Sequence, residues 1–308
     1  MTRLPVFYTD EFVLPLPDGH RFPMDKYRRL RERLAGGHQA ASLEFRVPDR
    51  ASRRALELAH DPAYVDAVID GTLDPRIQRR IGFPWSEAMV ERSRRSVGAT
   101  MAAAAAALER GIGVNLAGGT HHAFYDYGGG FCVFNDTVVA ARWLLDRGLV
   151  RQVLVVDLDV HQGDGTAALC HEDNRIFTLS VHGAKNYPAR KLPSDLDVAL
   201  PDEADDDTYL EAMRSGVRTA LDRARPDFVF YLAGADPYTE DRYGRLAMSK
   251  AGLAKRDRWV LETLAAAALP TAVAMAGGYA PDVDDIVDIH ERTVLTALAR
   301  VSGHIPAS

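Results

Sequence analysis

The sequence predicts an α/β protein with a mainly parallel β-sheet that helices cover on both faces. Short apolar segments alternate with amphipathic helical segments along most of the chain, which is typical of successive β-α-β units. The clearest segment is 154–156, a largely β-branched run of the kind found in strands buried on both faces. No internal repeat or linker-like change of composition divides the chain, so we expect residues 1–308 to form one domain.

Local sequence signals give the expected elements. The expected strands are 4–8, 112–116, 154–156, 176–181, 227–232 and 271–275. The expected helices are 26–33, 62–70, 86–108, 136–146, 166–171, 209–224, 250–268 and 284–301. The second helix has the clearest ends, because Asp61 is a good N-cap before Pro62 and Gly71 is a good C-terminal stop. Segment 184–206 carries three prolines, so we expect an irregular loop there.

Composition excludes several classes of protein. The net charge is −6 and basic residues form no patch, which argues against a nucleic-acid partner. No apolar segment approaches the roughly 20 residues of a membrane span, and the N-terminal residues lack a signal-peptide pattern, so we expect a soluble protein without a membrane partner. The two cysteines, Cys132 and Cys170, offer no disulfide framework and favour a reducing, cytoplasmic location. No pattern predicts the oligomeric state.

Four of the expected strands end at side chains that bind metals or transfer protons. These residues are His121 and His122 after the second strand, Asp157, Asp159, His161 and Asp164 after the third, Asp236 after the fifth, and Tyr279 after the sixth. The carboxyl ends of parallel strands face a common crevice, where ligands bind in open α/β sheets. We therefore expect these residues, which are distant in sequence, to lie close together.

The residue types at these strand ends predict a catalytic metal centre. Asp159, His161 and Asp236 offer three ligands and leave one position open, as in catalytic zinc sites. Fe(II) suits the same nitrogen and oxygen donors. The two adjacent histidines and the remaining two aspartates favour imidazole–carboxylate pairs, which fix each ring's tautomer and basicity. Tyr279 is placed to donate a hydrogen bond to a developing oxyanion.

Each of these residues also has a purely structural explanation. Asp159 and His161 alone suit a solvated strand end, and Asp236 before Pro237 suits a turn. Tyr279 alone suits a packed aromatic residue, as do the aromatic residues at 131 and 187. The metal centre is favoured because the structural explanations would all have to coincide at strand ends.

Four motifs in this order resemble the histone deacetylase superfamily over nearly the whole chain. They are GGTHHAFYDYGGGFCVFND (118–136), DLDVHQGDG (157–165), AGADP (233–237) and AGGY (276–279). Gln162 and the glycines 128–130 are more similar to class IV and related bacterial deacetylases. The resemblance implies an arginase–deacetylase fold with about eight strands. It also implies that zinc-activated water removes an acetyl or longer acyl group from a lysine or a related amine.

The resemblance also implies a role for each catalytic residue. Asp159, His161 and Asp236 match the zinc ligands, and Tyr279 matches the tyrosine that polarises the scissile carbonyl. His122, supported by Asp164, matches the general base and acid. His121, paired with Asp157, matches the second histidine, which orients or assists electrostatically.

Further positions match binding sites of that superfamily. Gly130, Phe131 and Tyr187 match the acyl tunnel. A structural K⁺ or Na⁺ site is matched by Asp157 and Ser180, with backbone oxygens of Asp159, His161 and Val181. Tyr209 is a candidate contact of a second such ion.

The sequence departs from the superfamily pattern in three places. Ala276 replaces the first of three glycines, Gln162 replaces a histidine, and no residue matches the rim aspartate that grips a peptide substrate. An acetylpolyamine or small-metabolite amidohydrolase is therefore an alternative. A two-manganese ureohydrolase is less favoured, because Pro237 and Tyr238 follow Asp236 where a second carboxylate would be needed. A non-catalytic acyl-lysine binder would be expected to lack a ligand or the tyrosine.

Overall fold

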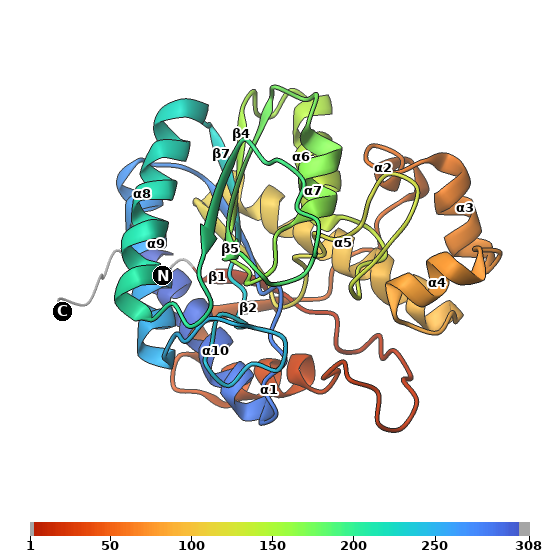
Figure 1. Ribbon diagram of the computed structural model, residues 1–308, viewed down its shortest axis with the longest axis horizontal. Coiled ribbons are helices and arrows are strands. Elements are labelled where there is room, and N and C mark those ends of the chain that lie inside the picture. Colours follow the sequence, from red (N-terminus) through yellow and green to blue (C-terminus); the bar gives the residue numbers. More distant parts are fainter. Residues whose placement is uncertain (1–2, 302–308) are drawn as a thin grey trace.

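The computed structural model describes residues 3–301, and within that range eight strands form one parallel sheet (Figure 1). The strand order is β2-β1-β3-β8-β7-β4-β5-β6. The strands are β1 (Leu4–Phe7), β2 (Leu43–Arg46), β3 (Ile112–Asn115), β4 (Val153–Asp157), β5 (Ile176–Gly183), β6 (Leu196–Leu200), β7 (Phe228–Leu232) and β8 (Thr271–Ala274). The predicted α/β class with a parallel sheet is thus confirmed.

The two edge strands were not predicted. Segment 184–206, expected to be an irregular loop, contains β6, which pairs with β5, and β2 pairs with β1 at the opposite edge. An edge strand pairs on one side only and is partly exposed, so it needs no continuous apolar run. In β6 the half-buried Leu196 and Val198 alternate with exposed residues, a signal too short to recognise among the surrounding prolines.

The helices match the expected segments, with two short additions, α2 and α4. They are α1 (Lys26–Gly36), α2 (Arg53–Leu56), α3 (Pro62–Asp70), α4 (Pro75–Ile81), α5 (Glu87–Arg110), α6 (Asp136–Asp146), α7 (Asp164–Cys170), α8 (Asp206–Ala224), α9 (Lys250–Ala266) and α10 (Val283–Val301). At the predicted cap of α3, the Asp61 carboxylate accepts a hydrogen bond from the Ala63 backbone, and Gly71 is left-handed (φ 71°). Between residues 3 and 301, no helix has both the length and the apolar character needed to cross a membrane.

Alternating side chains of each central strand pack against different helices. Leu154 and Val156 of β4 belong to a core formed with α1, α8, α9 and α10. Val153 and Val155 belong to a second core formed with α3, α5 and α6. Figure 1 shows α8 and α6 on opposite sides of the sheet. Burying each such side chain stabilises the fold by about 1.5–3 kcal/mol, so both faces hold the central strands rigidly.

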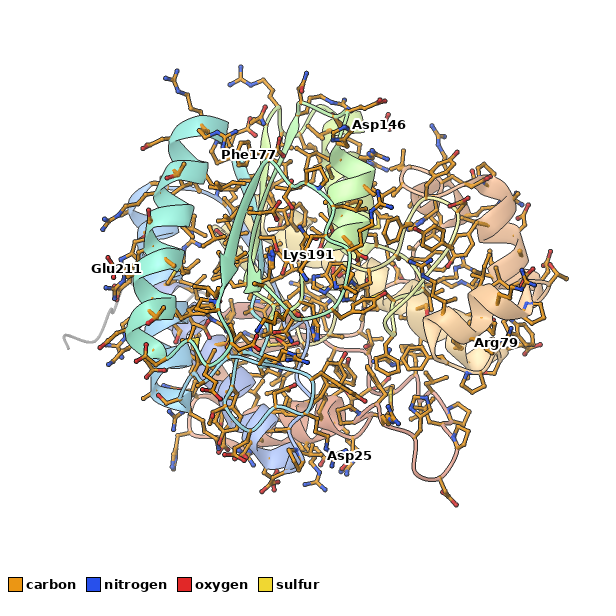
Figure 2. The ribbon with its side chains drawn as sticks, in the orientation of Figure 1. Asp25, Arg79, Asp146, Phe177, Lys191 and Glu211 are labelled. Atoms are coloured by element: carbon orange, nitrogen blue, oxygen red, sulfur yellow. The ribbon has the colours of Figure 1, made fainter. Side chains whose placement is uncertain are left out.

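The strand order brings together the strand ends that carry the candidate site residues. Asp146, just before β4, and Phe177, near the start of β5, both lie at the top of Figure 2, so these parallel strands run downward in that view. The strands β3, β8, β7 and β4 are consecutive neighbours in the sheet. Their carboxyl ends are the four exits at which the sequence places acidic, histidine and tyrosine side chains.

Candidate metal centre and active site

Three buried side chains converge beyond β4 and β7. Asp159 and His161 follow β4, Asp236 follows β7, and one ligand atom from each lies within 4.8 Å of the others. His161 Nδ1 lies 3.0 Å from Asp159 Oδ1 and 3.3 Å from Asp236 Oδ2. The structure therefore brings together the three residues expected to hold a metal.

Backbone amides fix the orientation of both carboxylates. Asp159 accepts hydrogen bonds from the amides of His161 (2.9 Å, Oδ1) and Gly277 (2.8 Å, Oδ2). Asp236 Oδ1 accepts one from Val160 (2.9 Å). Position 277 requires glycine, because a Cβ atom there would collide with carboxylate oxygens of Asp236 and Asp159. This support preorganises the three donors.

The electrostatics of the cluster suit a divalent cation. Asp236 Oδ2 is buried and accepts no hydrogen bond, so one ligand atom lacks a partner. Burial and the neighbouring Asp159 raise the pKa of Asp236 to about 7. Burial opposes protonation of His161, but its hydrogen bond to Asp159 and the nearby charge of Asp236 raise its pKa to about 10. Without a metal the cluster thus retains protons, and a divalent ion would neutralise the same charge. The donor set therefore fits zinc or Fe(II).

Two imidazole–carboxylate pairs lie beside this cluster. His121 Nδ1 is 2.7 Å from Asp157 Oδ2, and His122 Nδ1 is 2.6 Å from Asp164 Oδ1. An ionised carboxylate only accepts, so each Nδ1 donates and each Nε2 is the remaining ring nitrogen. The two ring centroids are 4.2 Å apart.

The two histidines differ in charge. Burial and the charge of His121 lower the pKa of His122 to about 4, although Asp164 opposes this. Burial opposes protonation of His121, but Asp157 and Asp159 raise its pKa to about 9. The two pKa values therefore shift in opposite directions, which favours a neutral His122 beside a cationic His121.

A cavity of about 520 Å³ is lined by Asp159, His161 and the two histidines His121 and His122. Gly130, Phe131 and Tyr187, the expected tunnel residues, line it together with Tyr279. Tyr187, 43% exposed, lies towards the open end, and its ring centroid is 4.8 Å from that of His122. The deeper lining of the cavity includes buried residues of α1 and α5.

Tyr279 lies in this cavity as a neutral phenol. Burial and the carboxylates of Asp159 and Asp236 raise its pKa well above the usual value, so its hydroxyl remains a hydrogen-bond donor. Its backbone amide donates to Asp241 Oδ2 (2.6 Å). The other oxygen of Asp241 accepts from the amides of Tyr243 (2.8 Å) and Gly244 (3.0 Å). Asp241 therefore ties the loop after β7 to the loop after β8.

Sequence reasoning missed Asp241 and Tyr243. The Tyr243 ring packs 5.1 Å from the Tyr279 ring and lines the cavity. The local pattern, Asp241 followed three residues later by Gly244, is typical of any turn. The contact with Tyr279 spans 38 residues, and no local signal reveals it.

Comparisons with known proteins identify the family. The sequence model described as Histone deacetylase domain matches residues 20–293. The chain belongs to the histone deacetylase family. It is 46% identical to an uncharacterized protein of Picosynechococcus sp., covering 93% of this chain and 95% of that protein. It is 28% identical to Histone deacetylase 2 of Arabidopsis thaliana, covering 91% of this chain and 75% of that protein.

Two solved structures share the fold. One is the HDA15 HD domain (TM-score 0.79, 21% identity, 96% of this chain and 90% of that chain). The other is acetylpolyamine aminohydrolase from Burkholderia pseudomallei (TM-score 0.73, 21% identity, 95% of this chain and 98% of that chain). The predicted arginase–deacetylase fold is thus confirmed. Membership of the histone deacetylase family supports a deacetylase activity, which is the hydrolysis of an amide.

The structure shows the conformation and contacts of two residues that depart from the family pattern, Ala276 and Gln162. Ala276 adopts the left-handed conformation (φ 55°), which favours glycine and costs an alanine about 1–2 kcal/mol. Gln162 donates to the carbonyl of Leu192 (2.6 Å) and accepts from its amide (3.0 Å). It thereby fastens the exit of β4 to the loop that carries Tyr187.

Two of the expected monovalent-cation residues lie side by side on β4 and β5. Asp157 and Ser180 are register partners on β4 and β5, and Val181 follows Ser180. The Tyr209 hydroxyl, a candidate for a second ion, lies 3.4 Å from the carbonyl oxygen of Leu158. The buried Arg256 also donates to that carbonyl (3.3 Å).

Proposed function

We propose that this protein is a zinc-dependent amide hydrolase that removes an acetyl or longer acyl group from a lysine or a related amine. The observation that carries the proposal is the convergence of Asp159, His161 and Asp236, two of which, Asp159 and His161, line a cavity together with His122 and Tyr279. We propose that residues 1–308 form one catalytic domain. Fe(II) is the alternative ion for the same donors.

The bound ion would supply Lewis acidity towards a carbonyl oxygen and a water molecule. The proposed task of His122 is proton transfer, for which its neutral form and Asp164-held ring are suited. His122 takes a proton from the water as its oxygen bonds to the carbonyl carbon. It then gives a proton to the amine nitrogen as the C–N bond breaks. The products are a carboxylate and a free amine.

Two further groups act on the charge that develops on the carbonyl oxygen. The neutral Tyr279 hydroxyl donates a hydrogen bond to that oxygen, and such donors matter most when the oxygen becomes negative. His121, kept cationic by Asp157, adds a fixed positive charge beside the centre. In this proposal, His122 with Asp164 transfers the proton, whereas His121 with Asp157 provides the fixed charge.

The charge of the cavity favours an acyl-lysine over an acylated polyamine. Its lining includes Arg21 and Arg80, with two further cations deeper inside, whereas Asp159 is its one carboxylate among the residues the structure describes. A polyamine would bring additional positive charges into this basic environment. An acylated lysine side chain carries none within the tunnel. An acetylpolyamine substrate is the second candidate for the experiment below.

We also propose a structural K⁺ or Na⁺ ion held by Asp157 and Ser180 with backbone oxygens of Asp159, His161 and Val181. The adjacency of Asp157 and Ser180 on neighbouring strands supports this assignment. Such an ion would lie behind the metal centre and stabilise the exit of β4.

A hydrolysis assay tests the proposed function. Purified protein is incubated with a fluorogenic acetyl-lysine peptide, longer acyl-lysine peptides and acetylspermidine, with and without a chelator. We expect hydrolysis of the lysine substrates, loss with chelator and recovery with added Zn²⁺. His122→Ala should abolish turnover and retain bound metal. Hydrolysis that the chelator leaves unchanged, or wild-type rates in His122→Ala, would contradict the proposal.

A further inference from the structure

The inner end of the cavity contains two buried cationic side chains. Lys26 of α1 is 3% exposed and Arg92 of α5 is 7% exposed, and both line the cavity. Figure 1 shows α1 at the bottom of the molecule and α5 crossing its middle. Buried cations at the closed end of a substrate cavity need a physical explanation, because removing a charge from water is costly.

Neither cation has an anionic partner. Among residues 3–301, no carboxylate oxygen lies within 4.0 Å of the Lys26 ammonium or the Arg92 guanidinium. Lys26 Nζ donates to the carbonyl oxygen of Gly278 (3.1 Å), and the buried Arg92 Nε has no hydrogen-bond partner. Both cations lie against the same Tyr27 ring, with Arg92 Cζ 4.6 Å and Lys26 Nζ 5.3 Å from its centroid. One aromatic ring thus has two positive charges beside it.

A second buried arginine, Arg256, provides a comparison, because its guanidinium has protein partners. Arg256 is fully buried and its Nε donates to Asp257 (2.8 Å). Its Nη1 also donates to the carbonyl of Gly234 (2.7 Å). Arg92 has no such partners, although it is almost as deeply buried. Among the described residues, the Arg92 charge thus has the Tyr27 ring beside it but no carboxylate like that of Asp257.

The position of the two cations indicates which part of a substrate they meet. On the proposed function, the amine enters from the exposed end near Tyr187, and the scissile carbonyl lies at Tyr279 and the metal ligands. The acyl group then points towards the inner end, where Lys26 Nζ lies 5.2 Å from the Tyr279 ring. A negative charge at the far end of the acyl group would lie between the cations.

We propose that the inner end of the cavity binds the distal carboxylate of a short dicarboxylic acyl group, such as succinyl, through Arg92 and Lys26. This inference rests on the proposed function and names its acyl class. The guanidinium can bind a carboxylate with two parallel hydrogen bonds, and the ammonium adds a second charge-assisted contact. The carboxylate would supply the missing anionic partner of Arg92.

The test compares two peptides that differ only in this charge. One carries succinyl-lysine and the other succinamoyl-lysine, the neutral amide of the same shape. Calorimetry measures their binding to zinc-loaded protein carrying His122→Ala, so that turnover does not interfere. We expect the succinyl peptide to bind about tenfold more tightly or better, and Arg92→Gln to remove this preference. Arg95→Gln is the matched control on α5, because Arg95 pairs with Glu91 outside the cavity.

Equal binding of the two peptides, or the same preference after Arg92→Gln, would overturn the inference. If Arg92→Gln fails to fold, Lys26→Gln gives the same comparison. The released carboxylate is the other source of an anion, so acetate alone is titrated as well. Acetate binding that depends on Arg92, without selectivity between the peptides, would overturn the assignment to the acyl group. Selectivity without any peptide hydrolysis by wild-type protein would support the binding site and refute the proposed function.

Discussion

Asp241→Asn separates the position of Tyr279 from its chemistry. In the wild type, one carboxylate oxygen of Asp241 accepts from the Tyr279 amide (2.6 Å) and the other accepts from the amides of Tyr243 and Gly244. Asparagine has the same shape but one acceptor oxygen, and its NH₂ group cannot accept from an N–H donor. The side chain is expected to keep its oxygen towards Tyr243 and Gly244, because two bonds are retained that way. The amide of Tyr279 then loses its partner.

The structure sets the size of the effect. A buried N–H without a partner costs about 1–3 kcal/mol. The Tyr279 loop can relieve this cost by moving its amide towards water, which displaces the hydroxyl from the carbonyl oxygen. If the whole cost falls on the transition state, kcat decreases by a factor of about 5–150. The substitution leaves the three proposed metal ligands in place, so zinc content should be unchanged.

The assay measures kcat and KM for the acetyl-lysine peptide together with zinc content by mass spectrometry. We expect kcat to fall and zinc content to stay at the wild-type level. Adding Asp241→Asn to Tyr279→Phe should lower kcat by much less than adding it to the wild type, because the hydroxyl it positions is already absent. Wild-type kcat in Asp241→Asn, or an equal decrease in both backgrounds, would refute the reasoning.

Three further substitutions test other parts of the structure. Tyr279→Phe removes the proposed donor to the developing oxyanion, so kcat should fall about 10²–10³-fold while zinc content is retained; equal losses of both would contradict this role. Asp257→Ala leaves the buried Arg256 charge without its carboxylate and removes the acceptor of Tyr231 and Thr293, so urea unfolding should show a loss of about 3–5 kcal/mol. Burial lowers the pKa of His60 from 6.5 to about 4, so between these values only the unfolded state binds this proton, and stability should fall by about 3 kcal/mol as the pH drops through that range. His60→Gln should flatten this part of the pH dependence of urea unfolding; an unchanged dependence would show that His60 does not carry it.

The central strands and their exits could be predicted because their signals are local. A strand such as β4 is buried on both faces, so nearly every residue must be apolar until the strand ends. The chemical side chains then follow directly, and the parallel arrangement places the exits at one edge of the sheet. The edge strands β2 and β6 escaped prediction because they are short and only partly covered.

The support around the site could not be predicted, since it depends on contacts between distant segments. Lys26 donates to Gly278 across 252 residues, and Asp241 accepts from Tyr279 across 38. In the sequence, Lys26 is one of several charged residues of an amphipathic helix, for which an exposed position is the usual expectation. Its burial follows from the packing of α1 against α10 and of the Tyr279 loop above it, which no local pattern encodes.

Metal stoichiometry tests the central claim most directly. The protein is stripped with a chelator, titrated with Zn²⁺ and analysed by calorimetry and mass spectrometry, beside His161→Ala and the matched control His171→Ala on the surface. We predict one zinc ion per chain in the wild type and in the control, and loss of that tight site in His161→Ala. Two ions per chain, or an undiminished site in His161→Ala, would contradict a single ion held by Asp159, His161 and Asp236.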